Sequence, residues 1–341
     1  MKRTICILFF LVISGKLLSQ TPKDTIFFRN GSVIIGEIKM IKLGVVTFDP
    51  DEANDITVQL IKLKTISATG VIFRVENTLE HVFYGRLFPS AKPGFVNIVS
   101  ETDTVQEELE RISVLYPFKD AFLERFSGNA GLGYSYTRSS NFGRINFDLN
   151  ANYVTRKDEI TFDGHGIYSM SDTTFTRDQE DVNFKYNYYF GPTWFMTAFV
   201  SYQRNLELGI SRRYQQGIGA GNKFITTRHI FGWLRSGVAI NQQQSTDGEK
   251  SGTLTEIFGQ LQFNFFRFTI PKISFDFSQT FYYSLSQKDR IRNSGQTNLN
   301  WEIINDFDLS LGFYNNYDSK PPATAASTFD FGIVFGINYK F

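Results

Sequence analysis

The chain has 341 residues with a formal net charge of +1, and 36 of its residues are Phe and 16 are Tyr. Because there is no basic excess, the composition argues against a nucleic-acid partner. Aromatic residues make up 16% of the chain, a share that is unusual for a soluble globular protein and typical of a membrane β-barrel, whose outer wall and interfacial girdles are built from them.

Residues 1–20 have the pattern of a secretory signal peptide that is cleaved near its end. Lys2 and Arg3 form a positively charged start, and residues 5–13 form the apolar run that follows. This run is shorter than the ~20 residues that a membrane-spanning helix needs. The single cysteine, Cys6, lies in this segment, so we expect a mature protein with no disulfide and no cysteine metal site.

Residues 21–120 are expected to form a periplasmic β-rich domain with an internal duplication. Short apolar stretches separated by glycines run from residue 28 to 66, and a similar series runs from 73 to 114, at an offset of ~50 residues. Two bent sheets of the Sm-like half-barrel type are one interpretation, and chance similarity between short β segments is the other. The acidic loop at 49–55 lacks the ligand order of an EF-hand, so we interpret it as a solvated turn.

Residues 125–341 alternate between apolar and polar side chains over long stretches, which predicts an antiparallel transmembrane β-barrel of about twelve strands. Alternation places the apolar residues of a strand on one face and the polar residues on the other. The strands of a soluble sandwich have ~5–6 residues, whereas a tilted strand needs ~9–11 to cross a bilayer. The alternating stretches lie at residues 126–137, 144–154, 159–170, 180–190, 193–203, 214–225, 229–241, 254–266, 272–285, 291–303, 306–316 and 328–341.

The connections between these strands predict an orientation. An even number of strands places both ends of the barrel on the periplasmic side, where turns are short, and leaves the longer loops outside the cell. The longer or more polar connections, which we assign to the outer side, are at 171–181, 206–213, 243–252, 287–290 and 317–327.

The chain ends in an amphipathic strand that resembles the signal read by the barrel-assembly machinery. Phe335, Ile337, Tyr339 and Phe341 are spaced by two and therefore share one strand face, and Phe341 is the final residue. We therefore expect the assembly machinery and outer-membrane lipid as partners.

A glycine-patterned first strand, F-S-G-N-A-G-L-G-Y-S-Y-T at 126–137, is followed by a short polar turn at 139–141. These residues resemble the YdiY-like family, domain of unknown function 481, whose members are described as candidate salt-induced outer-membrane proteins. The segments at 24–31 and 36–38 are similar to the N-terminal region of relatives from Bacteroidetes-type bacteria. The resemblance implies a barrel in the outer membrane over residues 120–341, and it supplies no catalytic residues.

Polar residues at alternate strand positions are candidates to line a lumen. They are mixed in sign, which predicts weak ion selectivity for an open channel and equally a plugged interior held by hydrogen bonds. A twelve-stranded barrel lies between the filled eight-stranded barrels and the water-filled porins, so both outcomes stay open. The candidate lumen-lining residues are Asn146, Asp148, Asn150, Asp163, His165, Asn183, Lys185, Asn187, Gln262, Asn264, Asp276, Arg292, Gln296, Asn298, Asn300 and Glu302.

His165 is the candidate catalytic base of the barrel region. Ser169 shares its strand face, but the strand rise puts the two ~13 Å apart, too far for proton transfer. His165 is also expected to point inward, away from lipid. No His or Cys pair has the spacing of metal ligands, so we expect no catalytic residue, no cofactor and no metal.

These observations support three hypotheses of function. The leading one is an outer-membrane β-barrel of a Gram-negative cell that passes small solutes through a narrow lumen or takes part in envelope adaptation. The second is a closed structural barrel that anchors residues 21–120 in the periplasm for a protein partner. The third, a lipid-modifying enzyme, is disfavoured by the placement of His165.

Overall fold

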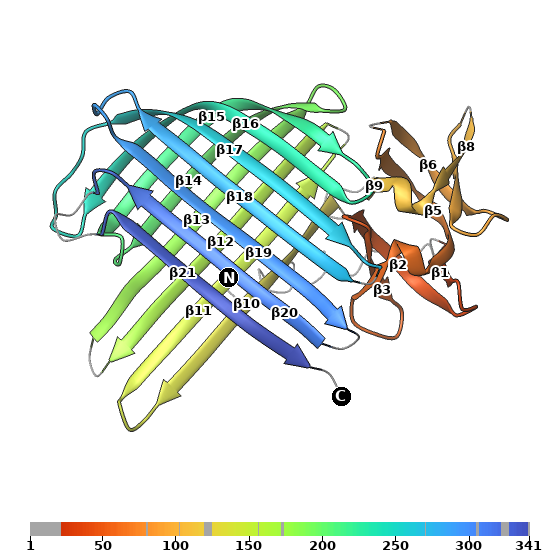
Figure 1. The fold of residues 1–341 in the computed structure, drawn as a ribbon, viewed down its shortest axis with the longest axis horizontal. Coiled ribbons are helices and arrows are strands. Elements are labelled where there is room, and N and C mark those ends of the chain that lie inside the picture. The colour runs from red at the N-terminus through yellow and green to blue at the C-terminus, as the bar shows by residue number, and fades with distance from the viewer. Residues whose placement is uncertain are drawn as a thin grey trace, which may run out of the picture.

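The computed structural model shows two β-sheets that follow one another along the chain (Figure 1). The structure describes residues 22–79, 81–101, 103–118, 125–155, 157–171, 174–269, 271–304, 307–321 and 327–339. The predicted signal peptide with Cys6, and the final Phe341, lie outside the described residues. Across the described part of the chain, no helix has the length and apolar character needed to span a membrane.

The first sheet belongs to a small domain, here called the first domain. Its elements are β1 (Asp24–Phe28), β2 (Val33–Lys42), β3 (Val45–Pro50), β4 (Ile56–Gln59), the 3-10 turn η1 (Leu60–Lys62), β5 (Leu63–Asn77), β6 (Val82–Pro89), β7 (Phe95–Val99), β8 (Thr104–Glu108), the 3-10 turn η2 (Leu109–Arg111) and β9 (Ile112–Phe118). Their order in the sheet is β4-β3-β2-β1-β5-β6-β7-β8, and β9 pairs with both β2 and β5. This double pairing closes the sheet on itself around one core.

The first domain consists of two repeats that share the long strand β5. Ile26 of β1 pairs with Ile66 in the first half of β5. The corresponding residues of the second repeat, each 49 positions further along the chain, are Val75 in the second half of β5 and Leu115 of β9, and they also pair. The second half of β5 therefore takes the place of β1 in the second repeat. All four of these side chains are fully buried and form part of one apolar core.

Each repeat contains the same glycine-dependent turn. Gly44 and Gly94 both have positive φ, 74° and 83°, a conformation that glycine adopts without steric cost. The carbonyl of each glycine accepts a hydrogen bond from the first residue of a 3-10 turn, Leu60 (2.9 Å) in the first repeat and Leu109 (2.8 Å) in the second. The two leucines are buried, so the turns fold back onto the core.

The second sheet, here called the barrel sheet, is a meander of twelve antiparallel strands across the described residues. The strands are β10 (Phe126–Thr137), β11 (Phe142–Val154), β12 (Asp158–Ser171), β13 (Thr174–Tyr189), β14 (Trp194–Asn205), β15 (Ile210–Thr226), β16 (Ile230–Ser245), β17 (Leu254–Arg267), β18 (Lys272–Ser284), β19 (Ile291–Ile304), β20 (Phe307–Asp318) and β21 (Phe329–Tyr339). The predicted fold class, an antiparallel β-barrel of about twelve strands preceded by a small β-rich domain, is confirmed.

The prediction that residues 171–181 form an outer loop is wrong, because most of this segment belongs to a strand. β13 begins at Thr174 and pairs with β12 along its whole length, with a bulge opposite Ile167 and Tyr168. Apart from Phe175, the first half of β13 carries polar side chains on both faces, so it lacks the alternation by which a strand is recognised. Ion pairing within the strand, as between Arg177 and Glu180 at 2.5 Å, satisfies these polar groups.

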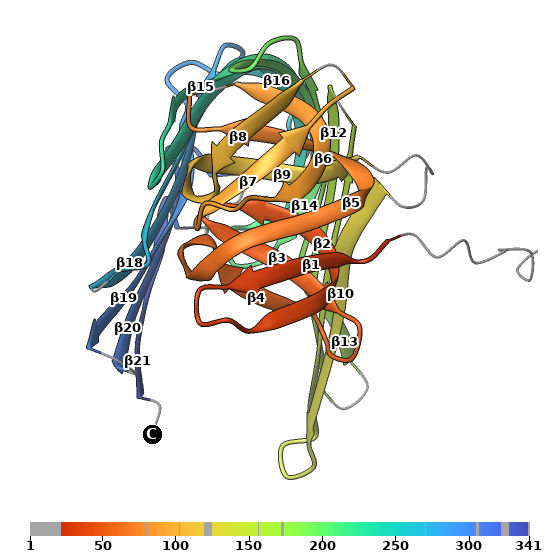
Figure 2. The ribbon, with the colours of Figure 1, turned by 90° about the vertical axis from the view of Figure 1, so that its right-hand side faces the viewer.

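The barrel sheet curls round but leaves two free edges. Within the described residues β10 pairs only with β11 and β21 pairs only with β20. Figure 2 shows the strands at the two ends of the sheet in opposite walls, with β15 and β16 joining the walls along one side. Every residue of β10 is exposed, as expected for a strand with one neighbour.

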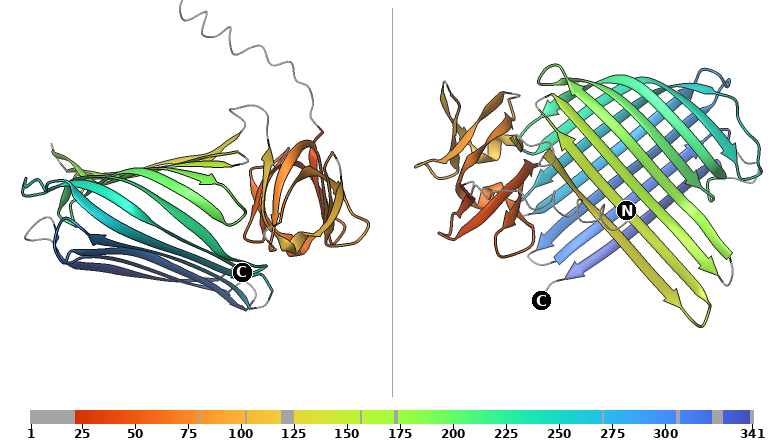
Figure 3. Two further views of the ribbon diagram at one scale, coloured as in Figure 1. Left: turned by 90° about the horizontal axis from the view of Figure 1, so that it is seen from above. Right: turned by 180° about the vertical axis from the view of Figure 1, so that it is seen from behind.

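The first domain sits against one end of the barrel sheet (Figure 3). We call this the near end, and the opposite end the far end. At the near end the strands are joined by short connections, such as residues 190–193 and 227–229, whereas the connections at 246–253 and 319–328 are at the far end. The two longest connections therefore lie at the far end, although those at 172–173 and 206–209, also at the far end, are short; which end faces the periplasm stays a prediction.

Candidate functional site: the concave face of the barrel sheet

The cross-strand registers divide the side chains of the barrel sheet into two faces. Phe184 of β13 pairs with Val200 of β14, and on the opposite face the neighbouring Lys185 pairs with Phe199. The Phe199 ring contacts the ring of Phe258 on β17, although two strands lie between β14 and β17. Such a contact is only possible inside the curl of the sheet. We call this side the concave face and the other the convex face.

The registers place all the candidate lumen residues predicted from the sequence on the concave face. Several of them bond to one another across strands. The Asn150 amide donates to Asp163 (2.5 Å), and His165 lies 2.8 Å from an oxygen of Asp148. Their role in lining a water-filled passage stays a prediction.

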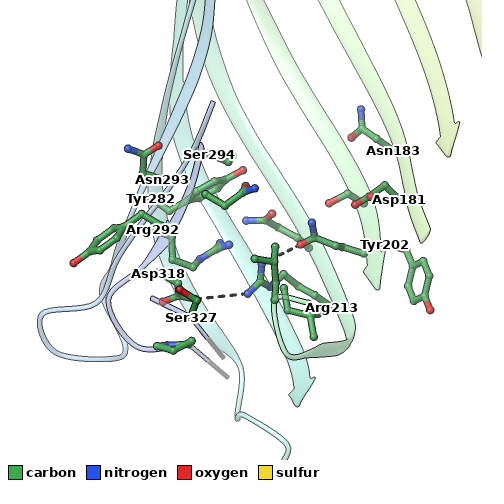
Figure 4. A pocket seen from close by; sticks show the side chains of 18 of the residues that line it. Asp181, Asn183, Tyr202, Arg213, Tyr282, Arg292, Asn293, Ser294, Asp318 and Ser327 are labelled. Atoms are coloured by element: carbon green, nitrogen blue, oxygen red, sulfur yellow. Dashed lines mark hydrogen bonds and ion pairs between the residues drawn. The ribbon is translucent and has the colours of Figure 1, made fainter. Parts of the chain in front are cut away.

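Five charged residues gather on the concave face towards the far end (Figure 4). They are Arg213, Glu256, Arg290, Arg292 and Asp318, and we call them the arginine cluster. Arg292 donates to both carboxylate oxygens of Glu256, at 2.9 and 2.5 Å. Arg290 donates to both oxygens of Asp318, at 3.0 and 2.6 Å. Arg213 lies 3.8 Å from Asp318. Arg290 and Glu256 are at most 1% exposed, so their charges depend on these partners.

Arg213 is bonded differently from the other two arginines. Its guanidinium donates to the side-chain oxygens of Gln243 (2.9 and 3.1 Å) and Gln203 (3.0 Å), which are neutral acceptors. A cavity of about 210 Å³ lies beside it and is lined by Gln215 and Asp181, among others. The buried amide nitrogen of Gln215 has no hydrogen-bond partner among the described residues. Charges of both signs and a spare donor therefore face this cavity.

Sequence reasoning found only Arg292 of this cluster. Arg213 and Arg290 fall in segments that the sequence predicts to be loops, at 206–213 and 287–290, and strand parity gives no direction for side chains in loops. Glu256 has the same strand parity as Gln262, so extending that pattern along the strand would have found it. The position of Asp318 follows from the extension of β20 beyond the predicted strand end.

Aromatic side chains interrupt the polar concave face halfway along the strands. Phe199, Ala239 and Phe258 are buried against one another, with Tyr282 packed beside them. The rings of Phe199 and Phe258 are 5.4 Å apart and nearly perpendicular, a favourable edge-to-face contact. We call these four residues the aromatic cluster. Strict alternation predicts a polar interior and gives no sign of these inward-facing rings.

A second cavity, of about 320 Å³, lies at the near end of the concave face and is lined by both domains. Along β14 the aromatic cluster separates it from the cavity beside Arg213. Five of its lining residues are basic and two are acidic. The charged residues around it are Lys42, Arg74, Asp158, Glu159, Lys185, Lys223 and Arg235. The near cavity is therefore positively charged on balance.

A buried ion pair joins the first domain to the barrel sheet. Lys223 of β15 contacts both carboxylate oxygens of Glu76 of β5, at 3.1 and 3.2 Å, and Glu76 is fully buried. Arg74 approaches the same carboxylate at 2.8 Å. Burial alone would lower the pKa of Arg74, but the charge of Glu76 and its hydrogen bond outweigh that effect and raise it. Nearby, burial and the Glu159 carboxylate raise the pKa of Tyr116.

Two further contacts support the same interface. Arg228, in the turn between β15 and β16, pairs with Glu108 (2.9 Å) and Glu110 (3.6 Å) of the second repeat. Gly44, in the first repeat, lies so close to the ring of Phe266 that a side chain at this position would collide with it. The two repeats therefore both contact the near end of the barrel sheet.

The structure also places the residues that the sequence offers as candidates for catalysis. Among the described residues, no group of three or more His, Cys, Asp and Glu side chains is arranged to hold a metal. The Ser169 hydroxyl donates to Asp178, while His165 contacts Asp148. These two candidate residues are thus bonded to different partners, and the absence of enzymatic activity remains a prediction.

The terminal strand presents its apolar residues outward. Phe335, Ile337 and Tyr339 share the convex face and are 60–62% exposed. They are thus accessible to a barrel-assembly partner. Phe341, the last residue of the predicted signal, lies outside the described residues.

A curled twelve-stranded sheet with a polar concave face and an apolar convex face defines the class of antiparallel β-barrel proteins. The chain belongs to the family described as "Protein of unknown function, DUF481", whose sequence pattern matches residues 130–341. No curated protein matches the chain.

Two solved structures are similar to this chain at low levels. A NanC porin is 10% identical, with a TM-score of 0.35, and the match covers 63% of this chain and 98% of the porin. A bacterial polysaccharide outer membrane secretin is 9% identical, with a TM-score of 0.35, over 80% of this chain and 97% of that one.

Proposed function

We propose that the protein is an outer-membrane β-barrel whose narrow polar passage is covered at the periplasmic end by the first domain. The observation that carries this proposal is the reversal of polarity across one sheet. Phe184, Val200 and Ile218 on the convex face are 44%, 55% and 70% exposed, whereas Glu256 on the concave face is fully buried. Water does not favour such an arrangement, but hydrocarbon around the convex face does.

The lengths of the strands support the same location. The shortest, β21, has 11 residues and the longest, β15, has 17. A tilted strand needs ~9–11 residues to cross the hydrocarbon. The convex apolar side chains are the expected contacts of outer-membrane lipid, and the terminal strand is the expected contact of the barrel-assembly machinery.

Two separate cavities, rather than one continuous channel, lie along the concave face. One cavity lies on each side of the aromatic cluster, and the first domain covers the near one through the Glu76–Lys223 ion pair. Small solutes can pass only when the aromatic rings and the first domain move. We therefore propose low or intermittent conductance rather than the steady current of a wide porin, consistent with a role in envelope adaptation.

Conductance of the full chain in a planar bilayer tests this function. Phe258→Ala should enlarge the passage and raise the single-channel current severalfold over the wild type. Phe281→Ala removes the same ring from the convex face, where the side chain is 51% exposed, and should leave the current unchanged. Inserted barrels that stay silent in the wild type and in Phe258→Ala alike would refute the passage.

A second candidate function is a closed barrel that anchors the first domain for a periplasmic partner. The buried interdomain ion pair favours it, because a fixed domain is what an anchor requires. The first domain also exposes Val33 and Ile35, each 51% exposed, on β2. If the channel tests fail, pull-down with the full chain should retain a partner that Ile35→Ser loses, and equal retention would refute the anchor.

A further inference from the structure

The convex face carries a group of arginines at the far end of β13, β14 and β15. Arg177 lies in β13, Arg204 in β14 and Arg212 in β15, around a hollow of about 620 Å³ on the outer wall. Arg177 pairs with Glu180 through two hydrogen bonds, of 2.7 and 2.5 Å. We call Arg177, Arg204 and Arg212 the rim arginines. Basic side chains on the lipid side of a barrel are costly near the midplane but cost little near the interface.

Among the described residues, two of the rim arginines have no anionic partner. Arg204 donates to the backbone oxygens of Arg177 (2.7 Å) and Ser211 (2.8 Å), which fixes its direction without neutralising its charge. Arg212 is exposed. Within the part of the chain that the structure describes, neither Arg204 nor Arg212 makes an ion pair. With one carboxylate, Glu180, against three arginines, the rim has an excess of positive charge.

Two tyrosines complete the hollow on the side towards the middle of the wall. Tyr202 and Tyr214 pair across β14 and β15, their rings are 5.2 Å apart, and the Tyr202 hydroxyl donates to Glu180 (3.2 Å). Tyr214 is 53% exposed. Tyrosines with an apolar ring and a polar tip are typical of the level where hydrocarbon meets headgroups.

An apolar hollow of about 440 Å³ lies next to the rim on the same strands. It is lined by Phe184, Val200 and Ile218, together with Val238 and Ile240. Successive outward side chains along a strand are ~7 Å apart, so Val200 is one step and Ile218 two steps from the tyrosine pair. Gly217 and Phe199 also line the hollow, and a side chain at position 217 would collide with the ring of Phe199.

From this juxtaposition we infer that the rim arginines and the adjacent apolar hollow form a binding site for a phosphorylated glycolipid of the outer leaflet. Guanidinium groups bind phosphate through paired hydrogen bonds, and the arginines stand at headgroup level. The apolar hollow begins one step below, where an acyl chain would lie. The inference rests on the proposed location, because the far end must face the outer leaflet.

Lipid retention by the purified full chain in neutral detergent tests this site. Native mass spectrometry after incubation with diphosphorylated lipid A should show a bound lipid on the wild type. Arg204→Gln with Arg212→Gln should weaken binding by about tenfold or more, since charge-assisted hydrogen bonds are lost. Arg212→Gln alone, which removes an exposed side chain, should weaken it less without endangering the fold.

The matched control is Arg267→Gln, because Arg267 is on the same convex face at the near end of β17. It should bind lipid A like the wild type. Equal binding by the double variant, by dephosphorylated lipid A or by phosphatidylglycerol in place of lipid A would each overturn the inference. Failure of the wild type to insert into phosphatidylcholine vesicles would instead refute the membrane location, so the two failures can be told apart.

Discussion

The first domain and the barrel sheet are both closely paired β-structures, but their polarity is opposite. In the first domain the side chains of Ile38, Phe48 and Phe73 are fully buried, and the fully buried Glu76 lies where the domain meets the barrel sheet. In the barrel sheet the fully buried groups include Glu256, while Val200 and Ile218 face outward. The difference shows that the kind of side chain that is buried, rather than the extent of burial, indicates the surrounding solvent. The first domain has the arrangement expected in water, and the barrel sheet has the one expected in lipid.

The largest effect is expected where the first domain depends on its apolar core. Phe48→Ala leaves a cavity in that core and should cost ~3–5 kcal/mol of stability. Hydrogen exchange of the β3 amides in the full chain measures this cost. Phe281→Ala, on the convex face, should leave the exchange of the β3 amides unchanged. Equal effects of the two substitutions would contradict the view that the first domain is stabilised by its own apolar core.

The concave face should be similarly sensitive, but to loss of charge. Glu256→Ala leaves Arg292 buried without its carboxylate, and breaking such a pair costs ~3–5 kcal/mol. The midpoint of urea unfolding in vesicles measures the loss. The double substitution Glu256→Met with Arg292→Met should restore much of it, because no charge then remains unpaired. A double variant as unstable as Glu256→Ala would contradict this account.

A charge placed on the convex face sharpens the comparison further. Ile218→Arg, near the middle of β15, should cost ~2–4 kcal/mol in vesicles, as arginine does near a bilayer midplane. The control is Gln216→Arg, because Gln216 is also on the convex face but lies one outward position closer to the rim, so this substitution should cost less. The adjacent Gly219 is unsuitable as a control because it is on the concave face. Measured unfolding energies that are unaffected by Ile218→Arg would indicate that water covers this wall.

The smallest effect concerns a partly exposed ion pair of the first domain. Lys39 contacts Asp49 (2.8 Å) and Glu37 (3.2 Å). Burial alone would lower the pKa of Lys39, but these carboxylates raise it above the ordinary 10.5. Its contribution to stability is therefore complete below that value and is lost as the pH rises through the folded pKa.

The pH dependence of the urea unfolding midpoint, followed by intrinsic fluorescence from about pH 9 to about pH 12, tests this contribution. The wild type should lose slightly more stability over this range than Lys39→Met. Parallel curves for the two chains would show that the pair contributes nothing measurable.

Much of the barrel sheet could be predicted from its alternation, because each strand carries its own pattern. The alternation predicts the first strand with the bounds that β10 has, Phe126–Thr137. The first half of β13 could not be predicted, since Arg177 and Glu180 satisfy each other and leave no apolar periodicity. Inward aromatic residues such as Phe199 also break the pattern. They could not be predicted because the residues that they contact across the curled sheet cannot be identified from the strand alone.

The contacts between the regions were beyond the reach of sequence reasoning. Glu76 and Lys223 are 147 positions apart, and neither lies in a motif that marks an ion pair. Gly44 is recognisable as a turn residue, but its packing against Phe266 depends on how the two domains meet. Local pattern thus predicts strands and faces, whereas the cover over the near cavity depends on tertiary structure.

The central claim is that hydrocarbon covers the convex face and polar groups or water occupy the concave one. Val200 and Ser201 are adjacent on β14 and point to opposite faces. Single cysteines at these positions, Val200→Cys and Ser201→Cys, can each carry a fluorophore in vesicles containing nitroxide-labelled acyl chains, in protein freed of the segment with Cys6. With hydrocarbon on the convex face, quenching should be strong at position 200 and weak at 201. Equal quenching at both positions, or none at 200, would contradict the central claim.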